Sequence, residues 1–62
     1  MAIEFKSYGY RIDSIENNIF LGVIFTESWN IYYTSMATEN QKQQILTKMK
    51  ELRDEKQNNN NV

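Results

Sequence analysis

The feature that most constrains this chain is a seven-residue apolar run, Ile19–Phe25, whose large side chains occupy both odd and even positions. Successive side chains of a strand point to opposite faces of a sheet. The odd positions carry Ile19, Leu21, Val23 and Phe25, and the even positions carry Phe20, Gly22, Ile24 and Thr26. Both faces of a strand over Ile19–Thr26 would therefore carry apolar groups, and the run is too short to span a bilayer as a helix.

Such a strand at the edge of a sheet would be an aggregation hazard, so we place Ile19–Thr26 at the centre. Upstream, apolar residues alternate over Ile3–Ile12 with a phase slip at Lys6–Ser7, which a β-bulge would accommodate. The alternative is that the first residues form a separate short strand. Asp13–Asn18 has the composition of a turn. Downstream, the polar residues from Glu27 predict a second turn and Ile31–Ser35 a third strand.

A capping box predicts the start of a helix at Thr38, with Gln41 three residues later. Beyond it one helical face carries the apolar residues Ile45, Leu46, Met49 and Leu52. We expect the helix to end near Gln57 and residues 58–62 to form a disordered Asn-rich tail. The prediction is one small α+β domain over residues 1–57, a three-stranded antiparallel β-meander followed by one C-terminal amphipathic α-helix.

Composition removes several classes of chemistry. The 62 residues include no Cys, His or Pro, and 7 basic residues face 8 acidic ones. Disulfides, thiolate catalysis, imidazole bases and the usual zinc ligands are therefore excluded. The two glycines are isolated and no nucleophile pattern is visible, so we expect neither an enzyme nor a cofactor or metal site. No targeting segment is recognisable, and we expect a cytoplasmic protein without membrane contact.

Small size makes association the expected source of additional stability. A chain of this length buries only about 60% of its unfolded surface, and apolar burial barely offsets the ordering entropy. With no disulfide or metal to compensate, we expect the core to be completed by a partner surface. A homodimer is the commonest route, formed either face to face or by pairing of edge strands.

A single helix covers only one face of a small sheet, and we expect it to cover the denser odd-numbered set of the central strand. The other face would then expose apolar and aromatic groups, which usually mark an interaction site. The expected partner-binding residues are Tyr8, Tyr10, Phe20, Ile24, Trp29 and Tyr32. Two alternatives stay open: the sheet curls so that these groups form a second small core, and Trp29 caps the main core rather than anchoring a partner.

The sequence thus favours a non-catalytic protein-interaction module. Its small size and its excess of residues with AT-rich codons are typical of phage or mobile-element proteins that bind and inhibit a host protein. The competing hypothesis is a weak single-stranded nucleic-acid binder that stacks bases on the sheet aromatics. Net charge argues against nucleic acid, because it is −1 for the whole chain.

Overall fold

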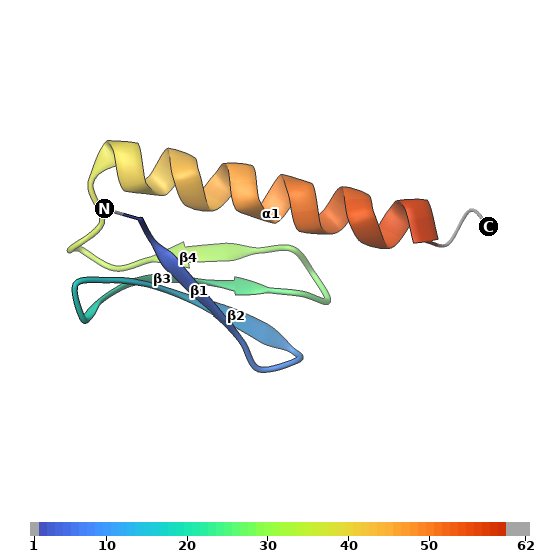
Figure 1. The fold of residues 1–62 in the computed structure, drawn as a ribbon, viewed down its shortest axis with the longest axis horizontal. Helices are drawn as coiled ribbons and strands as arrows, with labels where there is room; N and C mark the ends of the chain where they lie inside the picture. Colours follow the sequence, from blue (N-terminus) through green and yellow to red (C-terminus); the bar gives the residue numbers. More distant parts are fainter. Residues whose placement is uncertain (1, 60–62) are drawn as a thin grey trace.

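The chain forms an antiparallel four-stranded sheet with one long helix lying across one side of it (Figure 1). This computed structural model describes residues 2–59, with side chains described as far as Lys56. The elements are β1 (Glu4–Ser7), β2 (Arg11–Glu16), β3 (Ile19–Phe25), β4 (Ile31–Tyr33) and α1 (Glu39–Asn59). The strands lie in the order β1-β2-β3-β4, so β3 is an inner strand as predicted. The predicted antiparallel α+β fold with a C-terminal helix is confirmed, with four strands in place of three.

The fourth strand arises because Ile3–Ile12 is divided by a tight hairpin. Gly9 has a φ of 87°, and the Tyr8 N–H donates to the Arg11 carbonyl at 2.8 Å. A positive φ at the first of two central residues is the mark of a type II′ turn, which favours glycine there. The phase slip at Lys6–Ser7 therefore precedes a turn, and the single bulged strand predicted for this segment is wrong. The alternative of a separate short first strand is correct.

A second two-residue turn joins β2 to β3. Asn17 and Asn18 have φ values of 54° and 65°, the left-handed pair that a type I′ turn requires. The predicted turn over Asp13–Asn18 is too long, because the structure assigns its first four residues to β2. Turn-forming side chains at Asp13 and Ser14 misled the prediction, since pairing with both neighbouring strands outweighs their local preference.

A β-bulge in β3 decides which residues face the helix. Ser14 pairs with Gly22 and Ile15 pairs with Phe20, so Leu21 is an extra residue in β3. The extra residue shifts the alternation by one position. As a result Leu21 and Ile24 are both buried on the helix side, at 1% and 0% exposure. The predicted division into odd and even faces is wrong for this reason.

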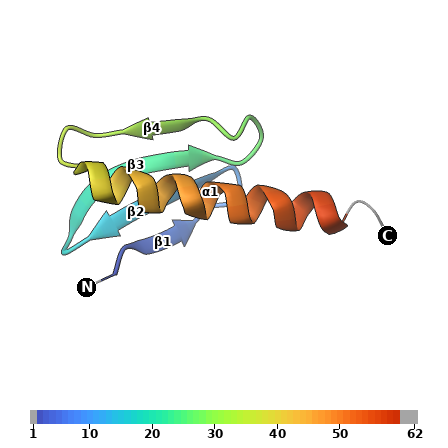
Figure 2. The same cartoon turned by 90° about the horizontal axis from the view of Figure 1, so that it is seen from above.

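The core lies between the two inner strands and the first half of α1. Seen from above, the helix runs over the middle of the sheet, with β4 to one side and β1 to the other (Figure 2). The buried apolar residues are Ile3, Ile12, Leu21, Ile24, Ile45 and Met49. Leu46 and Leu52 pack against this cluster, so all four predicted helix-face residues contribute to the core.

The start of α1 is held by the predicted capping box. The Gln41 N–H donates to Thr38 Oγ1 at 3.2 Å, and the Thr38 N–H donates to Gln41 Oε1 at 2.9 Å. The helix extends to Asn59, two residues beyond the predicted end. Of the predicted tail, Asn58 and Asn59 are helical, and residues 60–62 lie outside the described residues.

Removing the cap should weaken the fold measurably. We expect Thr38→Ala to lower the free energy of unfolding by about 1 kcal/mol, because the Gln41 N–H at the start of the helix loses its side-chain acceptor. The matched control is Thr47→Ala on the exposed face of α1, where alanine is the better helix former and no loss is expected. Urea unfolding followed by circular dichroism measures both, and equal effects of the two substitutions would contradict the cap.

Gly22 allows the backbone of β4 to pack closely against β3. A Cβ at this position would lie 2.7 Å from the Tyr32 carbonyl oxygen and 3.4 Å from the Tyr33 Cα. Both neighbours are backbone atoms, so Gly22→Ala should cost about 1–3 kcal/mol of stability by forcing β3 and β4 apart. At Gly9 a Cβ meets nothing within 4 Å, and Gly9→Asn, which tolerates the left-handed turn, should cost less. A Gly22→Ala variant as stable as the wild type would contradict this close approach.

Candidate functional site

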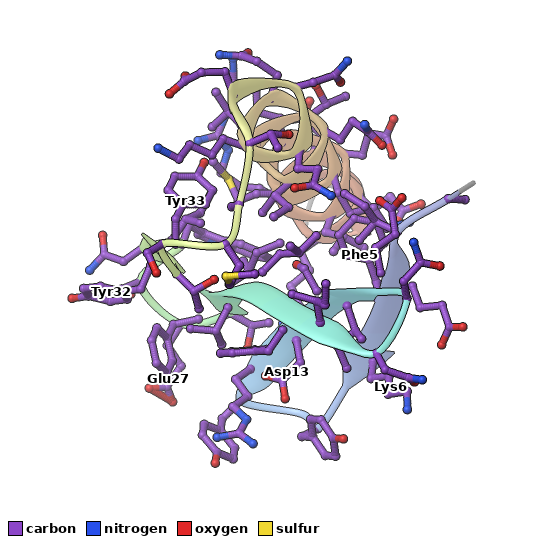
Figure 3. The ribbon with its side chains drawn as sticks, turned by 90° about the vertical axis from the view of Figure 1, so that its left-hand side faces the viewer. Phe5, Lys6, Asp13, Glu27, Tyr32 and Tyr33 are labelled. Carbon is purple, nitrogen blue, oxygen red and sulfur yellow. The ribbon has the colours of Figure 1, made fainter. Side chains whose placement is uncertain are left out.

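On the side of the sheet away from the helix, side chains of paired residues form rows that cross the strands. In the middle row Lys6 pairs with Asp13, Asp13 with Val23, and Val23 with Tyr32. Figure 3 shows Lys6 and Asp13 below the sheet, on the side opposite α1, whereas Phe5 and Tyr33 lie toward the helix. Because paired residues share a face, Val23 and Tyr32 also point away from α1. We call this side of the sheet the open face.

The neighbouring rows complete the open face. Glu4 pairs with Ile15 and Ile15 with Phe20 on one side, and Arg11 pairs with Phe25 on the other. Charged side chains occupy β1 and the start of β2, and apolar and aromatic ones occupy the end of β2, β3 and β4. We name this second group the aromatic patch: Ile15, Phe20, Val23, Phe25 and Tyr32.

Two members of the aromatic patch are widely exposed. Phe20 is 44% and Tyr32 60% accessible, whereas the other three members are half-buried. The Phe25 and Tyr32 rings meet edge to face, with their centroids 5.6 Å apart. This geometry is favourable for aromatic pairs and orients Tyr32 across the patch. The patch is therefore an ordered surface whose large side chains support one another.

A second group of side chains surrounds Arg11 beside the patch. The guanidinium carbon lies 5.2 Å from the centre of the Tyr8 ring and 5.7 Å from that of Tyr10. Arg11 Nε lies 3.3 Å from an oxygen of Asp13, forming an ion pair with a carboxylate whose side chain is only 13% exposed. We call these four residues the arginine cluster. Cation–π contacts and the carboxylate together hold the arginine in place.

The arginine cluster sits where two loops meet. Thr26 donates its N–H to the Tyr10 carbonyl at 3.0 Å and its hydroxyl to the Gly9 carbonyl at 2.8 Å. These bonds tie the β1–β2 hairpin to the end of β3, so Tyr8 and Tyr10 are presented by an anchored turn. Both remain exposed, at 54% and 59%. The loop bonds explain how two tyrosines on a hairpin are held beside the aromatic patch.

Four of the six sequence-predicted binding residues are exposed at this site: Tyr8, Tyr10, Phe20 and Tyr32. Ile24 is not at the site. It is fully buried beneath α1, and its predicted position on the uncovered face is wrong because the bulge at Leu21 reverses the alternation of β3. Phe20 faces solvent as predicted, whereas Ile24 belongs to the core.

Trp29 lies on the helix side and packs against the core cluster. Lys56 of α1 lies 5.6 Å from the centre of its ring. The residue has a φ of 62°, an uncommon conformation for a large side chain, and its N–H donates to the Phe25 carbonyl at 2.8 Å. This placement corresponds to the core-capping alternative for Trp29.

Sequence reasoning missed Arg11 and Asp13, together with Val23 and Phe25 of the aromatic patch. Glycine at the first central position of Tyr8-Gly9-Tyr10-Arg11 was the signal for the hairpin. Recognising it would have placed Arg11 and Asp13 on one face of the following strand, two residues apart. Val23 and Phe25 carried no equivalent signal, because the bulge that turns them outward leaves no mark in the apolar pattern.

No grouping of three or more acidic side chains suitable for a metal ion occurs within residues 2–59. In the same part of the chain, no helix is long and apolar enough to cross a membrane. A shallow groove of about 350 Å³ runs between β1 and α1, lined by Phe5, Gln43, Gln44, Thr47, Lys48 and Glu51. Five of its six lining residues are polar or charged, and the groove lies on the opposite side of the sheet from the aromatic patch.

Comparison of the chain with protein-family models, with curated proteins and with solved structures finds no match in any of the three. The function is therefore argued from the geometry of the open face.

Replacement by alanine distinguishes Trp29, on the core side, from Tyr32, on the open face. We expect Trp29→Ala to lower the free energy of unfolding by about 2–4 kcal/mol, because its ring packs against the core. Tyr32→Ala should cost less than about 1 kcal/mol, since most of that side chain is already in solvent. Chemical denaturation measures both, and a larger loss at Tyr32 would contradict the assignment of Trp29 to the core side.

Proposed function

We propose that this chain is a non-catalytic protein-interaction module that binds another protein through the open face, using the aromatic patch and the arginine cluster. The observation that carries the proposal is the continuity of these two groups on the one side of the sheet that the chain's only described helix leaves uncovered. Exposed apolar patches of this kind usually mark binding surfaces.

The residue types support a protein partner. Tyrosine, phenylalanine and arginine are enriched at the centres of protein interfaces, and tyrosine combines an apolar ring with a hydroxyl that can stay hydrated. The patch supplies Phe20 and Tyr32 as exposed rings, and the arginine cluster supplies a cation between two more. A polar margin follows on β1, where Glu4 and Lys6 are exposed. An apolar centre beside a charged margin is the usual layout of an interface.

The side chains of the open face are already held in place in the free protein, which also supports a role in binding. Arg11 is held by Tyr8, Tyr10 and Asp13, and Tyr32 is held by Phe25. Binding therefore requires little further loss of side-chain freedom, which otherwise costs about 0.5–1.5 kcal/mol for each immobilised side chain. A surface without catalytic groups acts by covering part of its partner. We therefore also propose the regulatory or inhibitory role that the sequence suggests.

The charge of the open face works against the nucleic-acid hypothesis. Its cations are Lys6 and Arg11, and Arg11 is paired with Asp13. Glu4 and Glu27 add further negative charge on this side, as Figure 3 shows for Glu27. Binding to single strands depends on cations that follow the phosphate backbone, and this surface offers no such track.

The proposal is tested by capture from cell extract with wild-type protein and two arginine variants. Phe20→Arg places a charge in the aromatic patch, and Gln43→Arg makes the same change in charge at an exposed position of α1, on the other side of the sheet. We expect specific partners to be retained by the wild type and Gln43→Arg and lost with Phe20→Arg. Circular dichroism confirms that each variant is folded, and mass spectrometry identifies what is captured.

Partners captured equally by all three proteins would contradict a role for the open face. Titration with short labelled oligonucleotides at two salt concentrations tests the competing hypothesis in parallel. Tight binding that weakens steeply with salt would replace the protein-interaction proposal with nucleic-acid binding.

A further inference from the structure

The outer edge of β1 offers unpaired main-chain groups. Within the described residues β1 pairs only with β2. The Tyr8 N–H donates to the Arg11 carbonyl, and hydrogen-bonded pairs recur at every second residue of an antiparallel ladder. Lys6 with Asp13 and Glu4 with Ile15 are therefore bonded pairs. The N–H and C=O groups of Phe5 and Ser7 point away from β2, toward a position that another strand could occupy.

The side chains of β1 select one register for pairing with a second copy. Antiparallel self-pairing that uses the free groups can centre on any residue of β1. Centring on Ser7 places Lys6 opposite Tyr8 and brings no opposite charges together. Centring on Glu4 places that residue opposite its own copy, and centring on Lys6 does the same for lysine, so both registers oppose like charges. Centring on Phe5 places Glu4 of each copy opposite Lys6 of the other. Only this register pairs opposite charges, and by symmetry it forms two Glu4–Lys6 pairs.

The helix side of the same edge also suits this pairing. Phe5 is half-buried and lines the groove between β1 and α1, with Lys48 Nζ 5.5 Å from the centre of its ring. In the register centred on Phe5, the two Phe5 side chains face each other across the new strand pair, on the helix side. Each ring would extend the small core of its own subunit toward the other, and the groove provides the room.

We infer that the protein forms a two-fold symmetric dimer by antiparallel pairing of β1 with β1 of a second copy, centred on Phe5, to give one continuous sheet of twice four strands. The β4 edge is the weaker candidate, because its three residues Ile31–Tyr33 contain no charged side chain to fix a register. A two-fold axis perpendicular to the sheet keeps both helices on one side. The two aromatic patches then share the other side and can engage a partner at two points.

Charge exchange at Glu4 and Lys6 tests the inference. Glu4 faces Ile15 within its own sheet, so Glu4→Lys places no like charge directly opposite it in the chain's own strand pair. We expect Glu4→Lys to weaken dimerisation about tenfold or more, because two attractive pairs become repulsive. Glu4→Lys with Lys6→Glu should restore most of it. Glu27→Lys, with the same charge change in a loop, is the control and should leave dimerisation unaltered.

The measurement is the molar mass by light scattering across a dilution series, starting from twice the 7.4 kDa chain mass at high concentration. Wild-type protein that stays at the mass of one chain at every concentration would overturn the inference. So would a Glu4→Lys variant that dimerises as well as the wild type, or a double variant that is no better than Glu4→Lys.

Cysteine pairing fixes the register independently, because the chain contains no cysteine of its own. A mixture of Glu4→Cys and Lys6→Cys chains should form disulfide-linked heterodimers under mild oxidation, since these positions face each other at about 4.5 Å between Cα atoms. Each variant alone should link far more slowly. Rapid linking of Glu4→Cys to itself, or of Lys6→Cys to itself, would overturn the register centred on Phe5.

Discussion

The arrangement of this molecule depends on the bulge at Leu21 in β3. One extra residue allows Leu21 and Ile24 to point to the same side, where α1 buries them with Ile45 and Met49. The same shift leaves Phe20, Val23 and Phe25 of β3 on the other side. Gly22 lies next to the bulge, at a point where the backbone of β4 approaches too closely for any Cβ. The core and the open face are thus two results of a single irregularity.

Coverage of one sheet face by one helix leaves the other face open, and this is the surface that we propose binds a partner. The helix satisfies the burial requirement of the two inner strands on its own side and leaves Phe20 and Tyr32 in solvent on the other. Beside them, Arg11 is fixed between Tyr8 and Tyr10 by contacts that a flexible hairpin could not maintain without the bonds from Thr26. The dimer that we infer through the outer edge of β1 would leave this surface free.

Much of this fold follows from local patterns in the sequence. The capping box at Thr38 and the apolar spacing after it predicted α1, because both depend on residues within one or two helical turns. The inner position of β3 followed from its apolar density. The face of each β3 residue did not follow, since a bulge is set by pairing with β2 and β4 rather than by the strand itself. Ile24 was misplaced on the open face for that reason. Phe20 was placed correctly only because the bulge lies between the two residues and turns Phe20 to the side opposite Ile24.

The most direct test of this account compares Ile24→Ala with Phe20→Ala by urea unfolding. Phenylalanine is the larger side chain, so size alone predicts the greater loss at Phe20. Burial predicts the reverse: a loss of about 2–5 kcal/mol at Ile24, which is fully buried, and clearly less at Phe20, which is 44% exposed. A loss at Phe20 equal to or greater than that at Ile24 would contradict the bulge-determined division of the sheet into a core face and an open face.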